Sequence, residues 1–209
     1  MTSSFSKQDY KVTQCETLYK GVFRLVRLHL RHRLFNGEWS NEFTREVLER
    51  GTAAAVLPYD PIRDRVILIE QFRPGALADP IHPWQIEIPA GMIKINEDPL
   101  NVAIRETKEE TDCDISDLEL IYEYFVSPGG STEYLHVYCG LVDSQNVGGT
   151  HGLPEENEDI RVLNLSTDEA IRMLRNKEIK NAPAIIAIQW LMLNRERLLK
   201  AIPHPAKTD

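Results

Sequence analysis

The sequence predicts an α+β fold in which helices cover both faces of a mixed sheet and a small antiparallel unit comes first. Apolar and polar residues alternate between about Asp9 and Arg50, which is typical of strands with one buried face. From Thr52 the chain changes to short, strongly apolar runs. Helix-opening signals interrupt these runs without a regular strand–helix alternation. We therefore expect an antiparallel unit over residues 1–50 and a main domain over residues 51–209.

The strands are bounded by turn signals. Asn36-Gly37 is a hairpin signal within the first unit. In the main domain we expect strands at Ala53–Leu57, Val66–Glu70, Trp84–Ile88, Leu118–Val126, Tyr134–Val142 and Ile160–Leu165. A long loop rich in glycine and acidic residues, Asp143 to Asp159, separates the last two.

Three helices are expected. Asp98 followed by Pro99 is an N-cap and first-turn signal, and this helix should end near Thr111-Asp112. Ser166 to Glu169 is a capping-box pattern that opens a second helix. The third, Ala182 to Ala201, contains the most apolar stretch of the chain, which we expect to be buried.

Charge and cysteine usage exclude several classes of protein. The net charge is −8 and no basic run is present, which argues against nucleic-acid binding through phosphates. No apolar stretch is long enough to span a bilayer, and the first residues do not form a secretory signal. Cys15, Cys113 and Cys139 have neither zinc-ligand spacing nor an even number, so reduced thiols in a cytoplasmic protein are expected.

Acidic residues are concentrated around the first expected helix: eleven acidic residues face three basic ones between Glu87 and Glu123. On a helical wheel, a face expected to pack on the sheet holds Leu100, Ala103, Ile104, Thr107 and Thr111. Glu106, Glu109 and Glu110 fall together on another face, where like charges repel. A solvated acidic face is the ordinary reading. The preceding Ile88–Gly91 turn instead favours carboxylate and carbonyl oxygens gathered for Mg²⁺ or Mn²⁺.

A specific motif covers the same helix. Gly91, Glu97 and the run from Arg105 to Cys113 resemble the Nudix box GX5EX7REUXEEXGU, where U is aliphatic, with six of its seven fixed residues in register. Asp112 stands where the box has its second glycine. Aspartate tolerates the left-handed conformation, so the helix can still end there.

Further segments resemble the bacterial ADP-ribose pyrophosphatases of this family. They are Glu16–Tyr19, Arg31–Gly37, Ile69–Gln71, Ser127–Gly130, His151–Leu153 and Glu155–Ile160, and Pro128 downstream of the box marks the same subgroup. The resemblance implies cleavage of ADP-ribose to AMP and ribose 5-phosphate. It also implies a homodimer in which the subunits exchange their N-terminal sheets.

The resemblance also assigns roles to residues. It implies Mg²⁺, for which Mn²⁺ can substitute, held by Glu106, Glu110, Glu158 and the carbonyl of Ala90. Glu109 lies close to the metals, and Glu156, Glu109 and Arg105 are the implied catalytic residues. Glu156 is the general base, with Glu155 left open as the alternative. The implied substrate contacts are Arg45, Glu46, Arg50, Arg73, Met92, Ser127, Pro128, Gly129 and Glu133, with Val22 and Phe23 contributed by the partner subunit. Val22 stands where the relatives place an aromatic residue that stacks on the base.

Three alternatives stay open. Ser127 to Glu133 also resembles Nudix hydrolases of GDP-mannose, whereas His151 to Ile160 favours ADP-ribose. A Nudix protein that binds ADP-ribose without cleaving it would not need the crowded carboxylates around Glu106. An acidic structural protein would show no metal-dependent change in thermal stability.

Overall fold

The computed structural model describes residues 5–200, apart from the side chain of Glu156, and the chain divides into two compact units. The first unit holds the residues up to Thr52 together with Phe125–Tyr134. The second unit holds Ala53–Tyr124 and the chain from Leu135 onward. The domain division expected at residue 50 stays a prediction. It differs from these two units in assigning residues 125–134 to the main domain.

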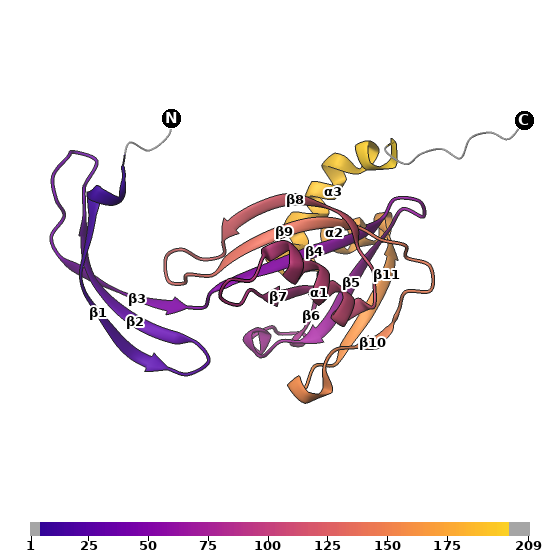
Figure 1. Ribbon diagram of the computed structural model, residues 1–209, viewed down its shortest axis with the longest axis horizontal. Coiled ribbons are helices and arrows are strands. Elements are labelled where there is room, and N and C mark those ends of the chain that lie inside the picture. Colours follow the sequence, from indigo (N-terminus) through magenta and orange to yellow (C-terminus); the bar gives the residue numbers. More distant parts are fainter. Residues whose placement is uncertain (1–4, 201–209) are drawn as a thin grey trace, which may run out of the picture. The chain divides into compact units, whose positions relative to one another are not determined.

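The chain has the predicted α+β fold, with a small antiparallel sheet, a larger mixed sheet and three α-helices (Figure 1). The small sheet follows a short 3-10 helix, η1, and has the order β1-β2-β3. Its elements are η1 (Lys7–Asp9), β1 (Tyr10–Lys20), β2 (Arg24–His32) and β3 (Phe43–Glu49). The turn predicted at Asn36-Gly37 is confirmed, since Gly37 has a φ of 88° and its amide donates to the Leu34 carbonyl at 2.9 Å.

The larger sheet has eight strands in the order β10-β11-β5-β4-β9-β8, with β6 paired to β5 and β7 to β4. The strands are β4 (Thr52–Asp60), β5 (Arg65–Phe72), β6 (Trp84–Glu87), β7 (Ala90–Met92), β8 (Ser116–Phe125), β9 (Tyr134–Leu141), β10 (Gly149–His151) and β11 (Ile160–Ser166). All six strands expected in this region are present. The segment from Asp143 to Asp159 was expected to be an irregular loop. That expectation was wrong in one respect, because the segment contains β10 and the short 3-10 helix η3 (Pro154–Glu156).

Helices cover both faces of the larger sheet, as Figure 1 shows: α1 lies on one face, and α2 and α3 lie on the other. The helices are α1 (Pro99–Thr111), α2 (Thr167–Arg175) and α3 (Ala182–Lys200), and a 3-10 helix, η2 (Pro74–Ala76), follows β5. Successive residues of β4 point to opposite faces, so Val56 packs with α1 residues and Leu57 with α3 residues. A strand covered on both faces has no polar side, which explains its nearly continuous apolar sequence.

The expected buried face of α1 was partly wrong. Leu100 and Ile104 are 42% and 44% exposed, while Val102 is fully buried. The helix is rotated so that the arc through Ala103, Thr107 and Glu110 faces the sheet, and this rotation carries a carboxylate into the protein.

The ends of α1 and α2 follow the predicted capping signals. The Asp98 carboxylate accepts from the Leu100 amide at 2.7 Å, and Ser166 accepts from the Glu169 amide at 3.2 Å. Asp112 has a φ of 56°, so it provides the left-handed helix stop that the Nudix box assigns to glycine.

The third helix is apolar but not wholly buried as expected, because Leu193 is 87% exposed while Leu191 is fully buried. Its expected last residue, Ala201, lies outside the described residues. Within the described part of the chain, no helix is long and apolar enough to cross a membrane.

A buried carboxylate, Asp60, ties the end of β4 to two loops. It accepts hydrogen bonds from the Ile62 and Arg63 amides at 2.9 and 3.0 Å, and from the Ser144 amide and hydroxyl at 2.9 and 2.6 Å. Burial alone would raise the pKa of Asp60, but the donors from Ser144 and Arg63 outweigh burial and lower the pKa to about 2. The ionised carboxylate is therefore favoured by folding.

Asp60→Asn is expected to lower the free energy of unfolding at pH 7 by about 2 kcal/mol, because an amide cannot accept all of these hydrogen bonds. A lowered pKa stabilises the folded state above the unfolded pKa near 4, and this contribution is lost as the pH falls toward about 2. Urea unfolding between pH 7 and pH 2.5 should thus show a shallower acid decline for Asp60→Asn than for the wild type.

Asp143→Asn is the matched control, since this carboxylate also pairs with Arg63 but is 72% exposed. Its effect should stay below about 0.5 kcal/mol. An identical acid decline in wild type and Asp60→Asn would contradict the assignment.

Candidate functional site

The acidic residues of α1 lie around one arginine. Arg105 contacts Glu106 at 2.8 Å, Glu109 at 3.1 Å and Glu97, which precedes the helix, at 3.4 Å. Arg105 thus pairs with Glu109 one turn along the helix, and two further carboxylates share the same guanidinium. A cation at this position offsets the repulsion among acids that lie three or four residues apart.

Glu110 lies on the sheet-facing side of the helix and is only 4% exposed. One of its oxygens accepts from the Ala90 amide of β7 at 3.1 Å. Burial raises the pKa of Glu110 to about 8; the Ala90 amide opposes this rise, as does the positive charge of Arg73, while Glu106 and Glu158 add to it. Without a cation beside it, this carboxyl group keeps its proton at neutral pH.

Glu106 is one turn earlier and is also shielded from water. Burial raises the pKa of Glu106, Arg105 opposes the rise, and the negative charges of Glu109 and Glu158 add to it. The structure therefore brings Glu158, which precedes β11, into electrostatic contact with both Glu106 and Glu110.

Two threonines support this helix beneath its carboxylates. The Thr107 hydroxyl donates to the Ala103 carbonyl at 2.8 Å, and the Thr111 hydroxyl donates to the Thr107 carbonyl at 2.6 Å. Both hydroxyls are buried and satisfied within the helix, which explains how threonine can stand on the face that packs against the sheet.

Gly91 leaves the space that Glu106 occupies. A Cβ built on Gly91 would lie 1.9 Å from the Glu106 carboxylate, an impossible approach. Any side chain at this position would move the carboxylate. The first glycine of the motif is thus needed for the placement of Glu106 rather than for a special backbone angle.

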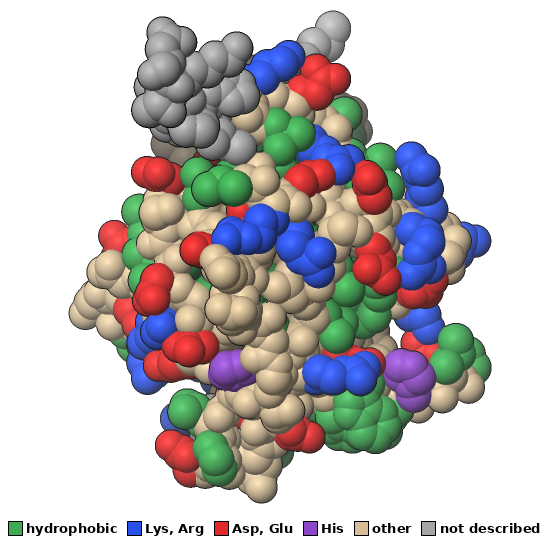
Figure 2. Space-filling view, turned by 90° about the vertical axis from the view of Figure 1, so that its right-hand side faces the viewer, with side chains coloured by type: hydrophobic (Ala, Val, Ile, Leu, Met, Phe, Trp, Pro, Cys, Tyr) green, Lys and Arg blue, Asp and Glu red, His purple; other side chains and the backbone are tan. Residues whose placement is uncertain are grey.

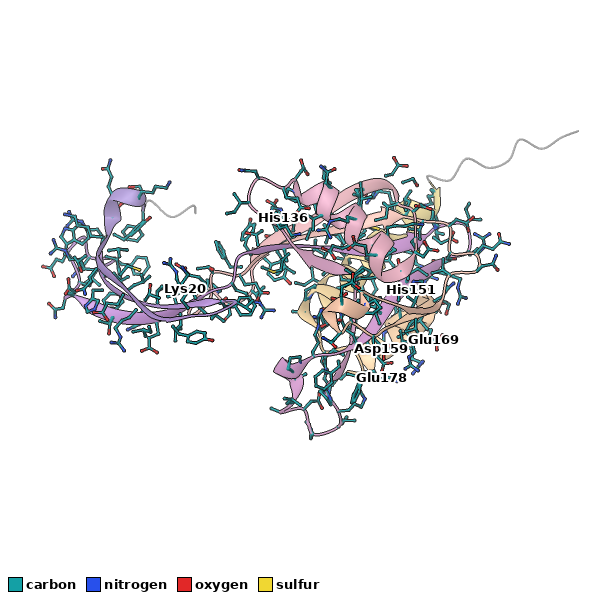
Figure 3. The ribbon with its side chains drawn as sticks, turned by 60° about the horizontal axis from the view of Figure 1, so that its bottom comes forward. Lys20, His136, His151, Asp159, Glu169 and Glu178 are labelled. Atoms are coloured by element: carbon teal, nitrogen blue, oxygen red, sulfur yellow. The ribbon has the colours of Figure 1, made fainter. Side chains whose placement is uncertain are left out.

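The segment between β10 and β11 presents Glu158. His151 and Asp159, both labelled in Figure 3, lie at its two ends. The segment closes on itself: the Glu158 amide donates to the Leu153 carbonyl at 3.2 Å, and the Leu153 amide donates to the Glu158 carboxylate at 3.4 Å. Gly152 has a φ of 101°, and a Cβ there would meet the Glu158 Cβ at 2.8 Å, so glycine is required for this closure.

The backbone of Glu156, the expected general base, lies in η3 of the same segment. Its side chain lies outside the described part of the structure. The choice between Glu156 and Glu155 therefore stays a prediction.

Other predicted contacts in the second unit lie on β5 to β7. Arg73 follows β5 and pairs with Glu87 at 2.8 Å. Met92 in β7 is 42% exposed. The sequence reasoning missed Glu87, which is 6% exposed; a carboxylate within an apolar strand was the signal that could have identified it.

The remaining predicted substrate contacts lie in the first unit. Arg50 pairs with Glu133 at 3.0 Å and stacks on the Phe23 ring at 5.4 Å, so these three residues are adjacent. Glu46 pairs with Arg27 at 3.0 Å. The others in this unit are Val22, Arg45, Ser127, Pro128 and Gly129, and Val22 is 96% exposed.

The carboxylates fit a divalent cation of the magnesium type. Among residues 5–200, no three acidic, histidine or cysteine side chains form a closed metal-binding group. Magnesium does not need one, since it binds through one or two carboxylates and completes its shell with water and phosphate. The all-oxygen donors Glu106, Glu110 and Glu158, whose negative charges act on one another, match this preference.

Comparisons with known proteins identify the family of the chain. The NUDIX domain family model matches residues 49–187. The chain is 43% identical over 93% of its length to the ADP-ribose pyrophosphatase of Escherichia coli K12, of which it covers 93%. It is also 43% identical to the ADP-ribose pyrophosphatase of Haemophilus influenzae over 93% of this chain and 91% of that protein. Over 72% of this chain and 78% of that protein, it is 32% identical to the GDP-mannose pyrophosphatase of Escherichia coli O1:K1.

Gly91→Ala should fold but bind Mn²⁺ about tenfold more weakly, because the new Cβ displaces the Glu106 carboxylate. Calorimetric titration with Mn²⁺ measures the affinity, and urea unfolding measures the stability. Gly148→Ala is the matched control, since its Cβ would meet no atom within 4 Å. Equal Mn²⁺ affinity in the two variants would contradict the role assigned to Gly91.

Proposed function

The chain belongs to the Nudix family, and from this premise we propose that it hydrolyses the diphosphate of ADP-ribose to AMP and ribose 5-phosphate, with Mg²⁺ as its cofactor. Membership of the Nudix family supports pyrophosphate hydrolysis as the reaction. The names of the relatives support ADP-ribose as the substrate. The observation that carries the proposal is the charge of Glu158 acting on both Glu106 and Glu110; burial, and then repulsion among these acids, raises the pKa of Glu106 and Glu110.

The proposed ligands are Glu106, Glu110, Glu158 and the Ala90 carbonyl, and Mn²⁺ can substitute for Mg²⁺. When bound, the cation neutralises phosphate charge and acidifies a coordinated water. It also makes an acidic site compatible with an anionic substrate.

The protein's own groups orient the reactants. Arg105 holds Glu109 and Glu106 by ion pairs, so their carboxylates stay in place on the helix. Arg73, fixed by Glu87, offers its remaining N–H groups to the diphosphate. We assign to Glu156 the removal of a proton from the attacking water, with Glu155 as the alternative.

The proposed base contacts come from the first unit. Arginine stacks on aromatic planes and a carboxylate accepts from an amino group, so Arg45, Arg50 and Glu46 suit adenine. Phe23 already stacks with Arg50, which supports it in place of the exposed Val22 as the residue that stacks on the base. We keep Met92, Ser127, Pro128, Gly129 and Glu133 as further proposed contacts.

GDP-mannose is the second candidate substrate, because a GDP-mannose pyrophosphatase is among the relatives. Its lower identity, 32% against 43%, favours ADP-ribose. Nucleic acid is not proposed as a partner: Figure 2 shows acidic and basic side chains interspersed on the face in view rather than a basic patch. We place the reaction in the cytoplasm, in keeping with reduced cysteines.

We also propose a homodimer with exchanged N-terminal sheets. Among the described residues of the first unit, only Val26 is buried, so its three strands have almost no core of their own. Large apolar side chains such as Tyr19 and Phe35 are instead exposed, at 65% and 98%. A sheet of this size needs another surface to cover its apolar face.

A substrate panel tests the activity. With Mg²⁺, the wild type should cleave ADP-ribose at least about tenfold faster than GDP-mannose or NADH, and EDTA should abolish turnover. Glu110→Gln should lower kcat at least about a hundredfold, since an amide cannot serve as an anionic metal ligand. Chromatography of the products identifies AMP and ribose 5-phosphate.

Glu119→Gln is the control for the carboxylate change, because Glu119 pairs with Arg197 on α3 instead of joining the cluster. A preference for GDP-mannose would replace the substrate. Activity that persists in Glu110→Gln or in EDTA would refute the catalytic assignment.

Light scattering tests the dimer. The wild type should have twice the monomer mass, and Tyr19→Ser with Phe35→Ser should weaken association because both changes remove exposed apolar surface. Ile62→Ser, on an exposed apolar residue of the second unit, is the control. A monomeric wild type at micromolar concentration would contradict the proposal.

A further inference from the structure

A short chain of hydrogen bonds connects the start of α3 to Arg73. We infer that Asn181 is a positioning residue that acts through Glu87 to aim the Arg73 guanidinium at the diphosphate. This inference rests on the proposed function, because it takes Arg73 as a phosphate contact. All three residues lie in the second unit.

The Glu87 carboxylate is buried and surrounded by donors. One oxygen accepts from Arg73 Nε at 2.9 Å, from Arg73 Nη2 at 2.8 Å and from Gln71 Nε2 at 3.2 Å. The other oxygen accepts from Asn181 Nδ2 at 2.9 Å. A carboxylate with both oxygens occupied cannot rotate without breaking a buried hydrogen bond.

Asn181 is itself held on two sides. Its Oδ1 accepts from the Ala184 amide at 3.1 Å, which caps the first turn of α3, and its own carbonyl accepts from the Ile185 amide at 3.0 Å. With its oxygen committed to the helix, the amide nitrogen can point only toward Glu87. The rigid start of a helix thus fixes one end of the chain of bonds.

Arg73 needs such an anchor because of its neighbours. It is 43% exposed in its side chain and lies near enough to Glu110 for its charge to act on that carboxyl group. An unanchored arginine beside Glu110 would turn toward this acid, which is one of the proposed ligands, and would occupy the proposed cation site. Glu87 binds the Nε–Nη2 edge, so the remaining N–H groups point away from it, available to a phosphate.

Asn181→Ser distinguishes the capping of α3 by residue 181 from its role in positioning Arg73. Serine still caps the helix, but it is too short to donate to Glu87. We expect the KM for ADP-ribose to rise about tenfold while kcat changes less than about twofold. Calorimetric binding of ADP-ribose with Mg²⁺ present, in a Glu155→Gln and Glu156→Gln background that removes both candidate bases, should weaken by a similar factor, which reports the arginine contact without turnover.

Ser166→Ala is the control for lost helix capping, since it removes the N-cap of α2 and should leave KM unchanged. Combining Asn181→Ser with Arg73→Lys should raise KM no further than Arg73→Lys alone, because the two residues act as one unit. An unchanged KM in Asn181→Ser, or fully additive effects in the double variant, would overturn the inference.

The outcomes also separate this inference from the proposed function. If the wild type cleaves a different nucleotide sugar, ADP-ribose is the wrong substrate. The same pattern of KM values on that other substrate would still support the positioning role. If the wild type cleaves none, ADP-ribose binding with Mg²⁺ present decides: equal affinity in wild type and Asn181→Ser refutes the positioning role.

Discussion

Repulsion among carboxylates that share one helix is the constraint on which the rest of this structure depends. Glu106 and Glu110 are shielded from water, and Glu158 approaches both of them from a separate segment. Such a group is costly in the absence of positive charge. Arg105 supplies part of that charge from the helix, and Arg73 supplies part of it from the end of β5. The fold therefore concentrates negative charge that a bound divalent cation would offset.

The surrounding elements hold these carboxylates in place. Gly91 leaves room for Glu106, the Ala90 amide fixes Glu110, and Gly152 allows the segment that carries Glu158 to close. Ala90 and Gly91 act from β7, each on one carboxylate, and Gly152 acts from the segment after β10. Their common effect is preorganisation, because the acidic groups cannot move apart to lower their repulsion.

Much of the fold could be predicted from local signals. The alternation of apolar and polar residues identified strands. Asp98 and Ser166 identified two helix starts, because their side chains cap the first turn. The rotation of α1 could not be predicted, because packing on β4 decides whether Val102 or Leu100 is buried. Within the site, Glu106 and Glu110 could be predicted from the sequence, through their helical spacing and the Nudix motif. The connection from Asn181 to Arg73 was not, since 108 positions separate two residues that only the tertiary fold brings together.

The edges of the larger sheet differ in a way that bears on self-association. The edge strand β10 has only three residues, so the side next to the acidic segment offers little backbone for another chain to pair with. The opposite edge, β8, has ten residues but carries Asp117, Glu119 and Glu123. The short length of β10 protects one edge of the sheet and the negative charge of β8 protects the other, so neither edge offers a long uncharged strand for another chain to pair with.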